Sequence, residues 1–272
     1  MPMSVEPVLD HVVVNARQEF GAAEECYRRL SFTLTPLGRH SLGSINRLAL
    51  FPRDYLELVG IDPQATAPRA ELLASPLGLN GLVFATEDAA ALHRALVARG
   101  APVEPPADFS RPQGTAEARF RVVRVAASHT PYGRVYFCQH LTRGLVWGAA
   151  AHAHANGAVA VARVAIAAPD PVAAGALYRS LFGDDAVAEV PGGVALAMGA
   201  ARLEILAPAR IAQQFGAAPA GGGMAALTLR TTSLDRTRRA LEAAGLRPAR
   251  DDGARIVLPP AAGFGAILEF VA

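Results

Sequence analysis

The chain of 272 residues contains no lysine, only two cysteines and no histidine after position 154. All its basic side chains other than histidine are therefore arginines, and they are scattered among acids to a formal net charge of +2. Because no basic stripe with interleaved aromatic residues occurs, we expect no nucleic-acid partner. Cys26 and Cys138 are too few for a disulfide framework and lack the spacing of a cysteine metal site.

Long hydrophobic runs are also missing. No segment approaches the roughly 18 uncharged apolar residues of a membrane span, and the N-terminus has no basic region followed by an apolar stretch, as a signal peptide would. We therefore expect a cytoplasmic protein without a membrane partner. Phosphate-binding, nucleophile-elbow and HExxH zinc motifs do not occur.

The sequence does contain one pattern that occurs four times: an apolar strand, a helix, and further extended segments separated by Gly and Pro. The first strands are predicted at 9–16, 79–87, 160–169 and 224–232, and the helices at 22–30, 88–100, 171–183 and 233–245. In the second unit only two strands, 117–126 and 133–142, are expected after a proline-rich segment.

These repeats predict an α+β protein of four βαβββ modules, paired into two cup-shaped domains with helices outside. The first two units form a domain over residues 1–148, and the last two a domain over 159–272. Residues 149–158 lack periodicity and are interpreted as the linker, in which His152 and His154 are expected to be solvated or to contact another subunit. A homodimer is a further expectation, since strand edges on such cups favour pairing.

Two stretches carry a resemblance to a known family. The strand LDHVVVNA, its helix and the run GRHSLGSINRLALFPRDYLELVGI resemble the glyoxalase-like domain of the vicinal-oxygen-chelate superfamily, and VARVAIAAPDPVAAGALYRSLFG resembles the opening of a glyoxalase or bleomycin-resistance module. The resemblance covers nearly the whole chain. It implies that a divalent metal is held in a cup by residues of the first and fourth strands of paired units.

His11 and Glu57 are the leading candidates for metal ligands. Alternation places His11 on the strand face of Leu9, Val13 and Asn15, opposite Asp10, and Glu57 on the face of Tyr55. A carboxylate among apolar neighbours needs a metal, an arginine or a proton. His11 occupies the first-strand ligand position that the resemblance implies.

The third ligand is open between His140 and Gln139. Aligning Gly133 with the glycine of GAILEF puts Phe137 at the fourth-strand position, with Gln139 on its face and His140 opposite. A one-residue slip or bulge would bring His140 inward, and the set His11, Glu57 and His140 would then suit Zn, Fe, Mn or Ni. Gly81 stands where the family often has a ligand, so the metal set is incomplete.

Other polar residues are expected around the same cavity. Asn46 and Arg47 are predicted to bind a substrate carbonyl or anion, since arginine offers a planar fork for an anion. His40 and His129 are candidates for proton transfer, because imidazole titrates near neutral pH. A solvated hairpin end and a surface histidine are the alternatives.

The second half of the chain is expected to lack a metal site. Arg163 takes the first-strand ligand position, and Glu204 and Glu269 keep the fourth-strand carboxylates without a histidine to join them. A carboxylate paired with Arg163 would be structural, so this half is interpreted as a degenerate copy.

The leading hypothesis is a small-molecule enzyme of lyase or isomerase type, with a divalent metal as Lewis acid on the vicinal oxygens of a carbonyl or diol. An alternative is a resistance-type protein that sequesters a small hydrophobic compound without turnover. A weaker one is an extradiol-type dioxygenase, whose metal usually lies in the C-terminal domain.

Overall fold

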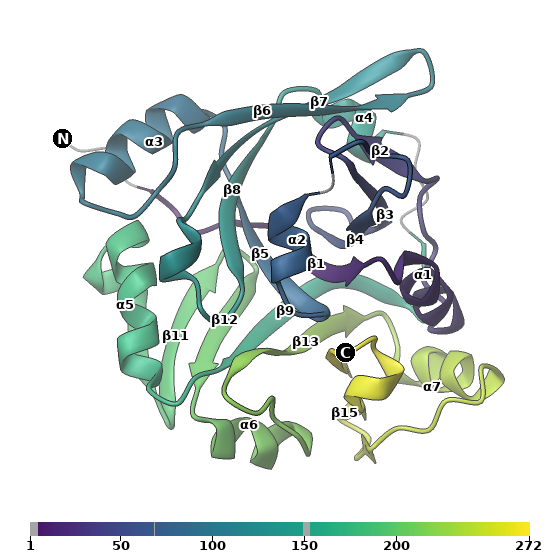
Figure 1. Ribbon diagram of the computed structural model, residues 1–272. Coiled ribbons are helices and arrows are strands. Elements are labelled where there is room, and N and C mark those ends of the chain that lie inside the picture. Colours follow the sequence, from purple (N-terminus) through teal and green to yellow (C-terminus); the bar gives the residue numbers. More distant parts are fainter. Residues whose placement is uncertain (1–4, 68, 149–152) are drawn as a thin grey trace.

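The computed structural model describes residues 5–67, 69–148 and 153–272, which form two eight-stranded sheets with helices around them (Figure 1). The N-terminal sheet has the strand order β2-β3-β4-β1-β5-β8-β7-β6, and the C-terminal sheet repeats it as β10-β11-β12-β9-β13-β16-β15-β14. The predicted α+β fold of four paired modules is confirmed.

Strand and helix bounds follow the chain in this order: β1 Leu9–Arg17, α1 Phe20–Arg29, β2 Gly38–His40, β3 Ser44–Leu50, β4 Tyr55–Ile61, α2 Ala70–Ala74, β5 Gly78–Ala85, α3 Ala89–Ala98, β6 Ala107–Gln113, β7 Ala116–Arg124, η1 Ala127–His129, β8 Arg134–His140, α4 Arg143–Trp147, β9 Ala158–Ala167, α5 Pro171–Phe182, η2 Asp184–Ala186, β10 Val187–Val190, β11 Gly193–Met198, β12 Ala201–Leu206, α6 Pro208–Phe215, β13 Gly223–Thr231, α7 Leu234–Ala243, β14 Arg250–Asp251, β15 Arg255–Leu258, η3 Pro260–Ala262 and β16 Ile267–Val271.

Alternation along each strand separates the inside of the N-terminal cup from its outer face. On β1, Val13 belongs to the cluster inside the cup, whereas Val12 and Val14 pack into the large core that the helices cover. Helix α3 begins at the predicted cap, where the Asp88 carboxylate accepts a hydrogen bond from the Ala91 amide at 2.9 Å.

Strand β6 was not predicted from the sequence, because its surroundings are rich in proline. Pro112 lies within β6 and is tolerated there because this is an edge strand of the ladder, where a missing amide costs least. The end of β2 and β6 approach one another: Ser41 donates its amide to the Ser110 carbonyl at 2.8 Å, and Ser110 donates its amide to the Ser41 hydroxyl at 3.1 Å. The N-terminal cup is therefore almost closed into a barrel.

The two sheets share one continuous core on their outer faces, and they lie one above the other in Figure 1. Between them, the Val161 amide donates to the Asp54 carboxylate at 2.9 Å, and Arg99 on the α3 side donates to the Leu181 carbonyl of α5 at 3.0 Å. No helix of the described residues is long and apolar enough to cross a membrane.

The described part of the expected linker is packed and not solvated. His154 is 2% exposed, with Nε2 at 3.0 Å from the Leu50 carbonyl and Nδ1 accepting a hydrogen bond from the Thr33 amide. The expectation of a solvated or subunit-contacting His154 is therefore wrong, because its ring fills a gap beside Phe51. His152 lies outside the described residues, and the domain boundaries stay predictions.

Candidate functional site

A cavity of about 580 Å³ lies inside the N-terminal cup. Its wall includes His11, Tyr55 and Glu57 from strands β1 and β4 and Tyr136 from β8. All of these side chains point inward because they share one face of their strands. The cavity therefore collects most of the chemically active residues of the N-terminal half.

A bulge in β1 brings Asp10 to the same side as His11. Strand β5 advances by one residue, from Phe84 to Val83, while β1 advances by two, from Leu9 to His11. The Asp10 carboxylate consequently lies 2.6 Å from His11 Nδ1, which strict alternation would not allow. The sequence interpretation of Asp10 as outward-facing is wrong for this reason.

The Asp10 carboxylate also lies 2.9 Å from His140 Nε2, through the same oxygen that meets His11. Burial opposes ionisation of this carboxyl, but hydrogen bonds with both histidines hold the pKa of Asp10 well below its usual range. An ionised Asp10 fixes the His11 ring with Nδ1 as its hydrogen-bonded nitrogen. Nε2 is then the nitrogen that faces the cavity.

Glu57 faces this free nitrogen across a gap. Its Oε2 lies 3.6 Å from His11 Nε2, and its Oε1 accepts a hydrogen bond from Asn46 Nδ2 at 2.7 Å. Burial alone would raise the pKa of Glu57, but the interaction with His11 and the hydrogen bond from Asn46 lower it. Glu57 is therefore a carboxylate at neutral pH, although its side chain is only 9% exposed.

Two tyrosines complete the surroundings of His11. The Tyr55 ring stacks on the imidazole with centroids 4.3 Å apart, which fixes the plane of the ring. The Tyr136 hydroxyl lies 3.5 Å from His11 Nε2. Burial, together with the charge of Glu57, raises the pKa of Tyr136 above its ordinary value.

His140 points into the cup without any slip of β8. Val122 pairs with Cys138, and Cys138 belongs to the cluster inside the cup, whereas Phe137 belongs to the outer core. Gln139 faces outward and donates to the Glu87 carbonyl. The predicted inward face of Phe137 and Gln139 is therefore wrong. His140 meets Asp10, and a role as direct metal ligand stays a prediction.

Asp10, Cys138 and His140 form a second group of possible metal donors. Their ligand atoms lie within 4.8 Å of one another. Burial raises the pKa of the Cys138 thiol well above its ordinary value, and the nearby charges of Asp10 and Glu57 add to this. The thiol is therefore protonated in the metal-free protein at neutral pH, and binding of a metal here would release that proton.

Comparison with known proteins agrees with this architecture. The family model of the glyoxalase-like domain matches residues 9–182, which is more than half of the chain. The chain belongs to the glyoxalase-like domain family. This family is part of the vicinal-oxygen-chelate superfamily, to which the sequence analysis found a resemblance. No curated protein sequence is significantly similar to this glyoxalase-like protein.

Solved structures share the fold over nearly all of the glyoxalase-like protein. A hypothetical protein from Staphylococcus aureus has a TM-score of 0.68 at 13% identity, with 98% of this chain and 99% of the other covered. A mutant 4-hydroxymandelate synthase from Streptomyces coelicolor has a TM-score of 0.63 at 14% identity, with 99% and 93% covered. A fusion of a xylose isomerase-like TIM barrel and 4-hydroxyphenylpyruvate dioxygenase has a TM-score of 0.60 at 17% identity, and this chain covers 49% of it.

The repeat within the glyoxalase-like protein identifies the equivalent positions of its two sheets. In the C-terminal sheet, Arg163 on β9 pairs with Thr228 on β13, which pairs with Glu269 on β16. In the N-terminal sheet, His11 on β1 pairs with Val83 on β5, which pairs with Tyr136 on β8. Tyr136, and not Phe137, therefore corresponds to Glu269. Gly81 pairs with Arg134, two residues before Tyr136, just as His11 pairs with Tyr55, two residues before Glu57, so Gly81 does occupy the position of His11 in the second unit.

In the C-terminal sheet, Arg163 occupies the centre of the cup. Its Nη1 lies 3.0 Å from a Glu204 oxygen and its Nη2 lies 2.6 Å from a Glu269 oxygen. Thr228 and Arg255 also donate to Glu269. The predicted pairing of Arg163 with these carboxylates is confirmed, and the guanidinium takes the space that a cation would need.

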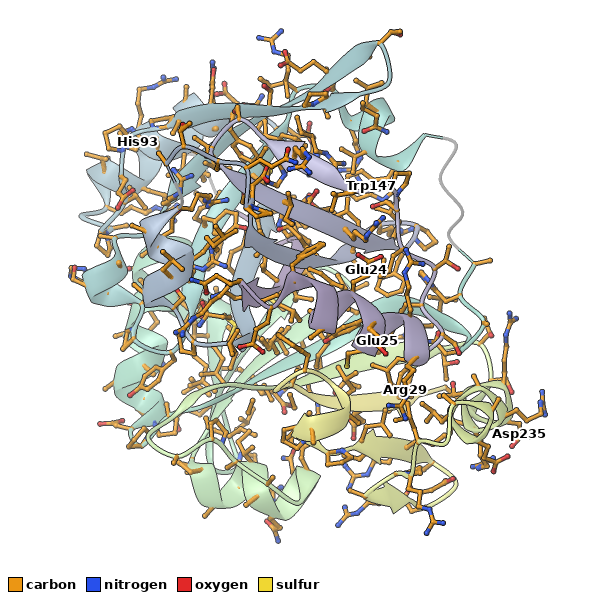
Figure 2. The ribbon with its side chains drawn as sticks, turned by 45° about the vertical axis from the view of Figure 1, so that its right-hand side comes forward. Glu24, Glu25, Arg29, His93, Trp147 and Asp235 are labelled. Carbon is orange, nitrogen blue, oxygen red and sulfur yellow. The ribbon has the colours of Figure 1, made fainter. Side chains whose placement is uncertain are left out.

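The remaining predicted residues are divided between the cavity and the outside. His40 and Asn46 line the cavity and are buried; burial lowers the pKa of His40 to about 4. Arg47 lies on the opposite face of β3, where it pairs with Glu24 at 2.8 Å; Glu24 is labelled on α1 in Figure 2. His129 is exposed and lines another cavity of about 530 Å³ beside α5.

Sequence reasoning missed the four arginines of the cavity wall, Arg69, Arg111, Arg124 and Arg134. Arg111 was missed because β6 was taken for a proline-rich loop. Arg134 could have been found, because Arg134, Tyr136, Cys138 and His140 alternate along β8 and share its inner face.

Proposed function

We propose that the N-terminal cup is the active site of a metal-assisted enzyme that acts on the carbonyl or diol oxygens of a small molecule. His11 Nε2 and Glu57 Oε2 would hold a divalent ion. The observation that carries this proposal is the Asp10 carboxylate at 2.6 Å from His11 Nδ1. A carboxylate on the distal nitrogen is the usual support of a metal-binding histidine.

The spacing of the donor atoms fits such an ion. Two metal–ligand bonds of about 2.1 Å at a tetrahedral angle put their donor atoms roughly 3.4 Å apart. Glu57 Oε2 and the Tyr136 hydroxyl lie 3.6 and 3.5 Å from His11 Nε2. Both contacts are too long for good hydrogen bonds, and Tyr136 supplies a third donor oxygen. Nitrogen and oxygen donors suit Zn, Fe, Mn or Ni.

When bound, the ion would act as a Lewis acid that polarises a substrate oxygen. The chain's own residues prepare the site for this role. Asp10 fixes the tautomer and position of His11, and Asn46 holds Oε1 of Glu57 so that Oε2 faces His11. His40 is neutral above about pH 5, because its pKa lies near 4, and it is the proton acceptor that we propose within the cavity.

Sequestration of a hydrophobic compound is less well supported. The cavity wall carries Arg111 and Arg134, and an apolar guest would leave Arg111 Nε and Arg134 Nη2 without water or a partner. That desolvation costs more than the contact with the apolar parts of the wall returns.

Metal analysis of the purified protein tests the proposal. We expect about one divalent ion per chain after reconstitution, and a loss of at least about 100-fold in affinity in His11→Gln and Glu57→Gln, because each removes a ligand. Cys138→Ser and His93→Ala are the controls; His93 is labelled on α3 in Figure 2, away from the cavity. Retention of the ion by His11→Gln, or its loss only in Cys138→Ser, would contradict the assignment.

A further inference from the structure

Two arginine side chains of the cavity wall, the buried Arg111 and the half-buried Arg134, have no acidic partner. Arg111 is 5% exposed; its Nη1 donates to Asn46 Oδ1 at 3.0 Å, and its Nε has no partner. Arg134 has only a long contact of 3.3 Å from Nε to Asn80 Oδ1, and its buried Nη2 has no partner. Among the described residues no carboxylate lies within ion-pair distance of either guanidinium.

Two guanidinium groups without an acidic partner are unfavourable in a cup that contains no ligand. A guanidinium cannot shed its proton at any pH that a protein meets, so burial cannot neutralise it. A guanidinium whose buried N–H groups have no acceptor can therefore bind an oxyanion. Burial lowers the pKa of Arg134 and the charge of Arg69 adds to this, whereas the charges of Glu57 and Glu71 act in the opposite direction.

The strand register places Arg134 beside the proposed metal ligands. Glu57 pairs with Val13, Val13 with Gly81, and Gly81 with Arg134, so all four lie in one row across the cup. The adjoining row contains His11 and Tyr136. The Val13 side chain lies against Gly81 in the middle of the first row, and Glu57 and Arg134 at its two ends both line the cavity.

Arg111 approaches this space from the opposite side of the cup. It reaches Asn46, whose other end donates to Glu57. No acid of the wall forms an ion pair with either arginine: Glu57 faces His11, Glu71 pairs with Arg69 at 2.7 Å, and Glu104 is exposed at the rim. The positive charge of Arg111 and Arg134 is left for a ligand.

We propose that this cavity binds small molecules with one oxyanion group, a carboxylate or a phosphate, which Arg134 and Arg111 hold. The inference rests on the proposed function for its catalytic meaning, since it names the substrate class of the same site. The anionic end is held at the level of Glu57, so the neighbouring carbon atoms lie next to His11. Arg47, which pairs with Glu24 outside the cup, takes no part.

Calorimetric titration of the folded protein, stripped of metal with a chelator, tests the inference. The probes are pentanoate, inorganic phosphate and, as an uncharged match, 1-pentanol. We expect pentanoate or phosphate to bind, whereas 1-pentanol binds at least about 10-fold more weakly. Binding of pentanoate alone identifies a carboxylate site, and binding of phosphate alone identifies a phosphate site.

The variants separate this inference from the metal proposal. Arg134→Gln and Arg111→Gln should weaken anion binding at least about 10-fold, and Arg134→Lys should recover part of it because the charge returns without the fork. Arg94→Gln, on the exposed face of α3, is the matched control. Thermal unfolding shows whether each variant is folded.

His11→Gln should keep anion binding, because the arginines act without the metal. The inference is overturned if anion binding requires metal or is lost in His11→Gln. It is also overturned if both arginine variants still bind the anion. The first two outcomes leave the metal proposal standing. If the native protein binds the anions but binds no metal, the metal proposal fails and the anion site stands.

Discussion

His11 and Arg163 occupy equivalent positions in the two sheets. His11 pairs with Tyr55, two residues before Glu57, and Arg163 pairs with Arg202, two residues before Glu204. His11 Nε2 lies 3.6 Å from Glu57 Oε2. The Arg163 guanidinium, in contrast, contacts the carboxylates of Glu204 and Glu269 directly. In the C-terminal cup the arginine itself supplies the positive charge beside the carboxylates, whereas the N-terminal cup has a histidine at this position.

Arg163→Met should destabilise the protein by about 2 kcal/mol. A wholly unpaired buried charge costs roughly 3–5 kcal/mol, but Glu269 keeps Thr228 and Arg255 as partners. Urea unfolding measures the change. Arg238→Met, which removes an exposed pair with Asp251, should cost clearly less, because solvent screens the pair. Equal costs for the two variants would contradict a supporting role of Arg163.

Asp10→Asn should reduce metal affinity by about 10- to 100-fold, because the charge that orients His11 is lost. A competitive chelator titration measures the affinity. Because the pKa of Asp10 is lowered in the folded protein, its contribution to stability is present above about pH 4 and is lost as the pH falls below this value. Asp10→Asn should remove that part of the acid sensitivity. Unchanged metal affinity would argue against His11 as a ligand.

Asp54→Asn should stabilise the protein at pH 8 and have little effect at pH 5. Burial raises the pKa of Asp54 to about 6, so the folded state binds more protons than the unfolded state between about pH 4 and 6. Stability therefore falls as the pH rises through this window, by up to roughly 3 kcal/mol. An asparagine keeps an acceptor for the Val161 amide without the charge.

Thermal unfolding of Asp54→Asn at both pH values measures the effect. Asp185→Asn, at an exposed position, is the control and should change neither melting temperature. A constant difference between Asp54→Asn and the native protein across the pH range would show that ionisation of Asp54 is not the cause.

Gly81→Ala should cost about 1–3 kcal/mol, because an added methyl group overpacks the cup. A Cβ at Gly81 would lie 2.7 Å from the Cβ of Val13. In the double variant with Val13→Ala the combined cost should be smaller than the sum of the two single costs. Denaturant unfolding of the three variants gives this comparison, and strict additivity would contradict the steric explanation.

The sequence was sufficient for the regular parts of the fold. Alternating apolar residues predicted the first strand of each unit, and Asp88 marked the start of α3. His11 and Glu57 were predicted on inward faces because β4, and β1 from His11 to Val13, alternate regularly. Regular periodicity is a local property, so local reasoning finds it.

The errors arose where tertiary contacts override local signals. The bulge beside Asp10 depends on the pairing of β1 with β5, which no single segment reveals. Strand β6 is possible despite Pro112 only because it lies at an edge of the ladder. The inward face of His140 depends on the register of β8, which an alignment on Gly133 placed one residue away.

The approach of β2 and β6 in the N-terminal sheet determines how copies of the chain can associate. In the described residues, β10 and β14 are the outer strands of the other sheet. β14 is two residues long and consists of exposed, charged Arg250 and Asp251, which oppose strand pairing. A dimer joined edge to edge would therefore use β10.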